Sequence, residues 1–208
     1  MDFSNLLIIL PIILFSVIVH EICHGLVAEK LGDSTARDAG RITLNPIPHI
    51  DPYGSILLPG ILIAVGSPIL LGAAKPVPVM FEHLRPRKLG MALVSIAGPA
   101  SNFLLAILFA IPITLGLVTG FMEKIWTYAV FINLILGTFN LLPIPPLDGS
   151  KILASLLPDE IMYRILEFER FGFFLIIILL LLGVLGWVLW PVVDIFFRIF
   201  NLNLFLLT

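Results

Sequence analysis

Residues 3–24 read FSNLLIILPIILFSVIVHEICH, an almost charge-free apolar run that ends in a His-Glu-x-x-His motif. On a helix, His20 and His24 lie four residues apart and share a face, so both imidazoles can reach one metal ion. Glu21 then lies beside the ion, where a general base is needed. Ionisable groups in a transmembrane segment are costly and usually functional, which favours a metal site over polar side chains that only reach toward the membrane interface.

The composition is that of an integral membrane protein. Of the 208 residues, 59% are hydrophobic and only 12% are charged, whereas soluble domains have about 25% charged residues. The mean hydropathy is +1.10. A net charge of −2 without a basic cluster argues against a nucleic-acid partner. Cys23 is the single cysteine, so neither an internal disulfide nor a cysteine-based zinc site is expected.

Four segments are long enough to cross a bilayer, which takes about 20 residues. They cover residues 4–31, 89–117, 125–142 and 171–190. The first has Asp2 in place of a basic flank and exceeds the length of a signal-peptide core, so we expect it to be retained. Pro191 interrupts the last segment, and the residues after it extend the helix or lie in the interface. We therefore expect an all-α polytopic membrane protein with about four transmembrane helices, forming one domain over residues 1–208.

The apolar segment 55–74 is rich in proline and glycine, which are unfavourable in a straight helix. If it enters and leaves the membrane on one side, ten of the twelve Lys and Arg residues share that side, and only Lys124 and Arg198 lie opposite. The positive-inside rule favours this re-entrant arrangement, with the cation-rich side cytoplasmic. Residues 41–44 and 76–79, on either side of it, are predicted to form short strands or extended loops.

A second motif, NLLPIPPLDG at residues 140–149, ends the third predicted span. Its three prolines break the helix and hold Asp148 on irregular backbone. The topology brings this stretch to the depth of His20, which lies about 24 Å along a helix from Ser4. Catalytic zinc commonly takes three protein ligands, and two imidazoles with one carboxylate match that set. Asp148 could instead cap a helix over residues 149–157, but the matching depth favours a metal ligand between the helices.

The chain resembles the site-2 proteases, which are intramembrane zinc metalloproteases. The resemblance rests on the His-Glu-x-x-His motif, on the 140–149 motif, and on AGPASN at residues 97–102, which is similar to the GPxxN element of that family. The stretches at 45–52 and 75–79 are similar to the short prokaryotic branch. The chain differs from larger relatives in having no PDZ or CBS module.

This resemblance implies an intramembrane zinc-dependent endopeptidase that cleaves transmembrane segments of membrane proteins near the cytoplasmic face. One Zn²⁺ per chain would be bound by His20, His24 and Asp148, and Glu21 would activate zinc-bound water as the catalytic base. The implied partners are the lipid bilayer and a membrane-protein substrate with a transmembrane helix, while the oligomeric state is left open. The implied location is the inner membrane of a prokaryote, as a multi-pass protein with its active site toward the cytoplasm.

Asn102 and Asn140 are candidate substrate-binding or oxyanion residues. On a helix rising from Leu89, Asn102 lies about 20 Å deep, where a buried amide commonly bonds a neighbouring helix. Gly98 and Ser101 beside it allow close helix contact, so helix packing is one interpretation. The family resemblance suggests the other, in which Asn102 and Asn140 hold an unwound substrate backbone.

A divalent-metal transporter or channel is the alternative function, since His, Glu and Asp in a membrane can line an ion path. Such a path needs polar groups spread along the spans from one face to the other, whereas here they cluster at one depth. The sequence has no visible inverted repeat of broken helices. A scaffold with a structural metal is a further alternative, but structural zinc has no use for an adjacent base such as Glu21.

Overall fold

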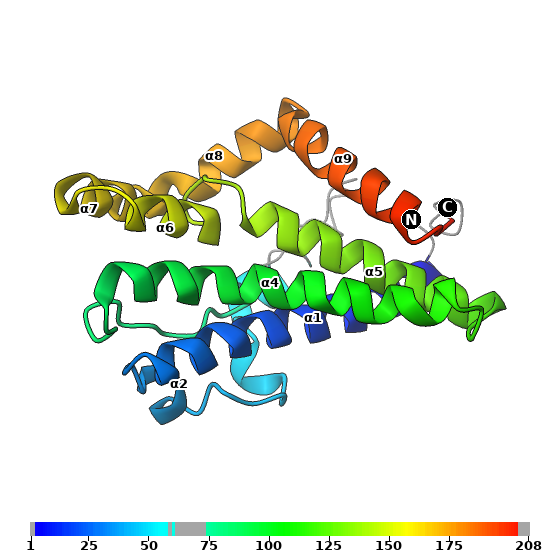
Figure 1. Ribbon diagram of the computed structural model, residues 1–208, viewed down its shortest axis with the longest axis horizontal. Coiled ribbons are helices and arrows are strands. Elements are labelled where there is room, and N and C mark those ends of the chain that lie inside the picture. Colours follow the sequence, from blue (N-terminus) through cyan, green and yellow to red (C-terminus); the bar gives the residue numbers. More distant parts are fainter. Residues whose placement is uncertain (1–2, 58–59, 61–73, 204–208) are drawn as a thin grey trace.

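The computed structural model describes residues 3–57, 60 and 74–203, which form helices, turns and loops without a β-strand among them. Three long helices lie side by side in Figure 1: α1 (Phe3–Lys30), α4 (Arg87–Thr114) and α5 (Gly120–Asn140). The shorter elements are α2 (Thr35–Asp38), η1 (Ile47–His49), η2 (Pro52–Leu57), α6 (Asp148–Ser155), α7 (Asp159–Glu167), α8 (Glu169–Leu181) and α9 (Val184–Ile199).

The largest apolar cluster joins α4, α5 and α9. Small alanines on α4 let the neighbouring helices approach closely, and branched and aromatic side chains of the other two helices fill the space around them. The buried members are Ala106, Ala110, Val130, Leu134, Val193 and Phe197. Helix α1 packs on the other side, against both α4 and α5. These contacts fix α1 and α4 relative to each other, and both helices carry residues of the candidate site.

Two of the described helices are long and apolar enough to cross a membrane, α1 over Asn5–Lys30 and α4 over its full length. Helices α8 and α9 reach that length only together and meet at 75°, so they add at most one bent span. Helix α5 has 21 residues, but Glu123, Lys124 and several buried polar side chains lower its hydropathy. The described residues thus contain two or three candidate spans, and the expected number of about four is not confirmed.

The predicted boundary of the last span is wrong. The helix ends before Gly183, which has a φ of 71°, whereas Pro191 lies inside α9. Glycine adopts this left-handed conformation without a Cβ clash, so the chain turns there. Proline is tolerated within membrane helices where neighbouring groups satisfy the freed backbone carbonyl. The glycine, and not the proline, therefore divides this segment.

Of the two forms predicted for residues 41–44 and 76–79, the structure shows bends or loops and not strands. The second stretch contains two prolines, which have no N–H to donate to a sheet. Its one intervening amide, of Val77, donates to Glu21 Oε2 at 2.6 Å. The backbone of this stretch is therefore extended but bonded to a side chain in place of a second strand.

The segment 55–74, predicted to be re-entrant, lies outside the described residues except at its ends and at Gly60. Its two flanks meet, because the Lys75 N–H donates to the His49 carbonyl at 2.9 Å. The Arg41 side chain also donates to the Lys75 carbonyl, with Nη2 at 2.5 Å. The chain therefore enters and leaves this segment at neighbouring points.

A charged clamp fastens α7 to the start of α4. Asp159 accepts Arg87 Nη2 at 2.6 Å and lies 2.8 Å from Lys88 Nζ. Arg87 also donates to the Tyr163 hydroxyl, and Lys88 donates to the Leu157 carbonyl. The two cations hold the pKa of Asp159 below its usual value, so the carboxylate stays charged at neutral pH. The clamp thereby keeps α6, which precedes α7, packed against α4.

Candidate metal centre

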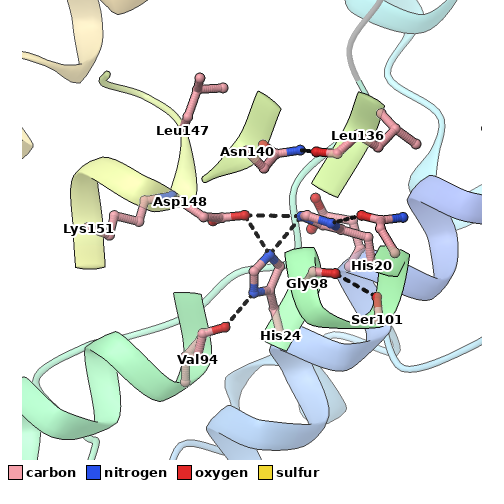
Figure 2. A network of polar contacts seen from close by, with 12 residues as sticks. His20, His24, Val94, Gly98, Ser101, Leu136, Asn140, Leu147, Asp148 and Lys151 are labelled. Carbon is pink, nitrogen blue, oxygen red and sulfur yellow. Dashed lines mark hydrogen bonds and ion pairs between the residues drawn. The ribbon is translucent and has the colours of Figure 1, made fainter. Parts of the chain in front are cut away.

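Three side chains from opposite parts of the sequence converge between α1 and α6 (Figure 2). His20 Nε2 and His24 Nε2 lie 3.0 Å apart, and Asp148 Oδ2 lies 3.1 Å from the first and 3.2 Å from the second. All three residues are buried. Ligand atoms around a tetrahedral zinc ion with bonds near 2.0 Å are about 3.3 Å apart. The spacing of these three atoms therefore fits one such ion.

The outer nitrogens of both rings show where the protons are. His20 Nδ1 faces Asn102 Oδ1 at 2.6 Å, and His24 Nδ1 faces the Val94 carbonyl at 2.7 Å. Both partners only accept hydrogen bonds, so each Nδ1 carries the hydrogen and each neutral ring presents an Nε2 lone pair inward. Two lone pairs and a carboxylate oxygen then meet with no proton between them. This donor set fits a cation, and its chemistry suits Zn²⁺.

Asp148 is the first residue of α6 and does not cap it. Leu147 is the N-cap residue, and no side chain makes a capping bond there. The carboxylate points toward the histidines, with its other oxygen 3.8 Å from Lys151 Nζ. Gly149 permits this approach, because a Cβ there would collide with the Leu141 and Leu142 carbonyls. Of the two interpretations of Asp148, its position favours a metal ligand.

Gly98 of α4 lies directly against the two histidines (Figure 2). A Cβ at this position would lie 2.5 Å from His20 Nε2 and closer still to His24 Nε2. Ser101 Oγ bonds the Gly98 carbonyl at 2.7 Å, within the same helix. The missing side chain therefore provides the space that the inward nitrogens occupy.

The structure separates the two candidate asparagines. Asn102 is fully buried and bonded to His20 Nδ1, so its position favours support of the histidine over contact with a substrate. Asn140 lines the cavity beside the cluster, and its Nδ2 donates one bond to the Leu136 carbonyl at 3.0 Å. No described residue accepts the second N–H of that amide.

A cavity of about 330 Å³ opens beside the cluster. Glu21 lines it next to the histidines, with Oε2 held by the Val77 N–H at 2.6 Å. Lys151 and Glu169 line it from α6 and α8. Glu21 is not one of the three clustered residues. Its carboxylate is therefore free of the cluster and accessible to a molecule bound in the cavity.

Several residues around the centre were not singled out for it by the sequence. Gly98 and Val77 lie in stretches noted for the family resemblance, but neither was expected to contact the site residues, and Glu169 lies in no motif. Ser16 and Asn133 are fully buried and bonded to each other at 2.9 Å. An asparagine in the middle of an apolar segment indicates a contact between helices, because an amide buried in a membrane forms a hydrogen bond with a neighbouring helix. The backbone amide of Val77 leaves no trace in a sequence.

Known proteins match this chain over most of its length. Residues 116–184 match the family model described as Peptidase family M50. The chain is 36% identical over 200 residues to "Putative zinc metalloprotease YwhC" of Bacillus subtilis, covering 89% of this chain and 87% of that protein. It is 32% identical over 175 residues to "Putative zinc metalloprotease Rip2" of Mycolicibacterium smegmatis, covering 81% of this chain and 64% of that protein.

An archaeal relative extends the match. "Putative zinc metalloprotease MJ0611" of Methanocaldococcus jannaschii is 31% identical over 155 residues, which cover 73% of each chain. No solved structure matches the chain. These relatives confirm the expected family, the zinc metalloprotease class and the zinc cofactor. The chain therefore belongs to peptidase family M50, the site-2 protease family of zinc metalloproteases.

Proposed function

We propose that this protein is an intramembrane endopeptidase that cleaves transmembrane segments of membrane proteins near the cytoplasmic face. The observation that carries the proposal is the buried cluster of His20, His24 and Asp148, which lies against apolar helices and beside a cavity lined by Glu21. Helices α1 and α4 are candidate membrane spans, and each contributes to this centre. A protease with its centre between such helices is suited to substrates that lie within the bilayer.

His20, His24 and Asp148 would hold the zinc ion. Bound there, the ion supplies Lewis-acid polarisation and positive charge beside the carbonyl that is attacked. With two neutral imidazoles and one carboxylate, the centre keeps a net charge of about +1. The hydrogen bonds from the two Nδ1 atoms to Asn102 and Val94 hold the rings in the orientation that binding requires.

Glu21 is the proposed general base. It follows a ligand histidine in sequence and lines the cavity without joining the ligand triangle. The Val77 N–H occupies Oε2, which leaves the other carboxylate oxygen to take a proton from the attacking water. Glu21 then returns that proton to the leaving amine. The free N–H of Asn140 is placed to donate to the substrate carbonyl as negative charge develops on it.

A helical substrate must unwind before it reacts, because its carbonyls are already hydrogen-bonded. The extended residues Pro76, Val77 and Val79 line the cavity together with Asp148. Two prolines in this stretch have carbonyls but no amide hydrogens. The stretch can therefore accept N–H groups of an unwound substrate segment without forming a paired strand.

The orientation rests on the distribution of cations. Arg85 N–H bonds the Leu31 carbonyl at 2.9 Å, so the end of α1 and the residues before α4 lie together. Arg87 and Lys88 are at this same end, in the clamp with Asp159. We assign this end to the cytoplasmic side of a prokaryotic inner membrane, since Lys and Arg accumulate there. The relatives from bacteria and an archaeon agree with a prokaryotic membrane.

Cells that produce either the wild-type protein or its Glu21→Gln variant provide the test. We expect the wild type alone to generate fragments of membrane proteins that end within a transmembrane segment, in its cytoplasmic half. Purified wild-type protein should cleave the same proteins, lose that activity with a zinc chelator, and regain it when Zn²⁺ is restored. Mass spectrometry of the fragment ends measures the cut. Cuts only in soluble loops, or cleavage that resists chelation, would contradict the proposal, and zinc uptake into liposomes without cleavage would indicate a transporter.

A further inference from the structure

A line of buried hydrogen bonds leads from the metal centre into α5. His20 Nδ1 contacts Asn102 Oδ1 at 2.6 Å, and Asn102 Nδ2 donates to Asn133 Oδ1 at 3.0 Å. Asn133 Nδ2 donates to Ser16 Oγ and to the Ala129 carbonyl, both at 2.9 Å. Asn102, Asn133 and Ser16 are each 0% exposed. Three helices thus contribute to one polar line that ends on a proposed zinc ligand.

The donor and the acceptor of each hydrogen bond in this line are fixed. The Ala129 carbonyl accepts but cannot donate, so Asn133 must turn its NH₂ toward it and its oxygen toward Asn102. Asn102 must then turn its NH₂ toward Asn133 and its oxygen toward His20. Within the described part of the chain, the only other partner that orients the Asn102 amide is the Ser16 carbonyl, at a longer 3.4 Å. The Nδ1 of His20 consequently carries the hydrogen, and Nε2 faces the centre without one.

We propose that Asn133 is a positioning residue for the metal centre, although it lies on a different helix from every proposed ligand and its described hydrogen bonds are to Asn102, Ser16 and Ala129. By fixing the Asn102 amide, it holds His20 in the tautomer that can bind a metal through Nε2. With the amide reversed, the NH₂ group of Asn102 would face His20, and the favoured tautomer would carry its hydrogen on Nε2. This inference rests on the proposed zinc site.

A simple packing role for Asn133 makes a different prediction. Buried amides also join membrane helices, so loss of Asn133 could loosen α5 from α1 and α4 without any specific effect on His20. In that case, each further loss of a hydrogen bond should weaken the centre more. A positioning role predicts instead that a second substitution, at Asn102, repairs the first.

Asn102→Asp can compensate for the loss of Asn133, because the two oxygens of a carboxylate are equivalent. An aspartate at position 102 presents an oxygen to His20 Nδ1 in either orientation, so it needs no neighbour to orient it. In the presence of Asn133, however, its second oxygen would face the Asn133 oxygen at close range. Asn102→Asp should therefore be harmful alone and beneficial in an Asn133→Leu background.

The test measures zinc affinity by chelator competition on the purified full-length protein in detergent. We expect Asn133→Leu to bind zinc about 10- to 100-fold more weakly, as is usual when a group that orients a ligand is lost. The double variant Asn133→Leu/Asn102→Asp should regain about tenfold or more of that loss. Thr127→Val is the matched control, because Thr127 is equally buried on α5 and, among the described residues, its hydroxyl bonds only the Glu123 carbonyl of its own helix. Its zinc affinity should equal that of the wild type.

The outcomes distinguish this inference from the proposed function. A wild-type protein that binds no zinc overturns both. A wild type that binds zinc, with Asn133→Leu within threefold of it, overturns the positioning role alone. A double variant that binds more weakly than Asn133→Leu also overturns it and leaves packing as the role of Asn133. Size-exclusion profiles and thermal unfolding of each variant identify any that fail to fold, and Asn133→Ser then replaces Asn133→Leu in the same comparison.

Discussion

Gly98→Ala is expected to weaken metal binding strongly while leaving the helix bundle folded. The added Cβ would lie 2.5 Å from His20 Nε2 and 2.6 Å from His20 Cε1, and closer still to His24 Nε2. The rings cannot simply move aside, because their Nδ1 atoms are bonded to Asn102 and Val94. Displacing either ring breaks a buried hydrogen bond and separates the ligand atoms. We expect zinc affinity to fall by about 100-fold or more, the upper end of the range for groups that position ligands.

The helix itself should tolerate this substitution. Alanine is favoured over glycine within a helix by about 1 kcal/mol, so any loss of binding comes from the collision with the histidines. Gly186→Ala is the matched control, since its nearest neighbour would be an ordinary contact at 3.6 Å from Trp190. The control should keep full zinc content and unfold at or slightly above the wild-type temperature. Equal zinc affinity of Gly98→Ala and the wild type would contradict the proposed geometry.

Glu21→Gln is expected to keep the metal and lose proteolysis. The side chain keeps its size, and the amide oxygen can still accept the Val77 N–H. It can no longer take a proton from water, and general-base catalysis typically contributes about 10²- to 10⁴-fold to the rate. We expect cleavage of a transmembrane substrate to fall by about that factor, measured as initial rates at equal zinc content.

Cys23→Ala is the control for this variant, because Cys23 lies within the same motif but outside the ligand cluster. It should retain both zinc and cleavage. A Glu21→Gln protein that cleaves within tenfold of the wild-type rate would show that another group supplies the base. Loss of zinc from Glu21→Gln would instead place Glu21 among the ligands.

The convergence of the metal cluster could be predicted from the sequence because two independent patterns place it. The spacing of His20 and His24 fixes a shared helix face, and the alternation of spans brings Asp148 to the same depth. The candidate ligand atoms of the three residues lie 3.0–3.2 Å apart, although Asp148 is 128 residues from His20 in the chain. Membership of the protease family followed from the same residues together with the AGPASN stretch.

Other features depend on how helices meet, and no single segment encodes that. The contact of Gly98 with both histidines requires the approach of α1 to α4, and the role proposed for Asn133 requires α5 as a third helix. The sequence also did not show which residue, a proline or a glycine, would interrupt the last helical segment. Proline at 191 is tolerated inside α9, whereas Gly183 turns the chain. Residues 76–79 form an extended loop and not a strand, because the prolines lack amide hydrogens and the Val77 N–H bonds Glu21.

The zinc content of the purified full-length protein tests the central claim most directly. One zinc ion per chain is predicted for the wild type and for Glu21→Gln, and strong loss is predicted for His24→Ala and Asp148→Ala, measured by elemental analysis against protein concentration. His83→Ala serves as the control, because this largely exposed histidine pairs with Asp33 outside the cluster and should keep its zinc. Full zinc retention in both His24→Ala and Asp148→Ala would contradict the proposed metal centre.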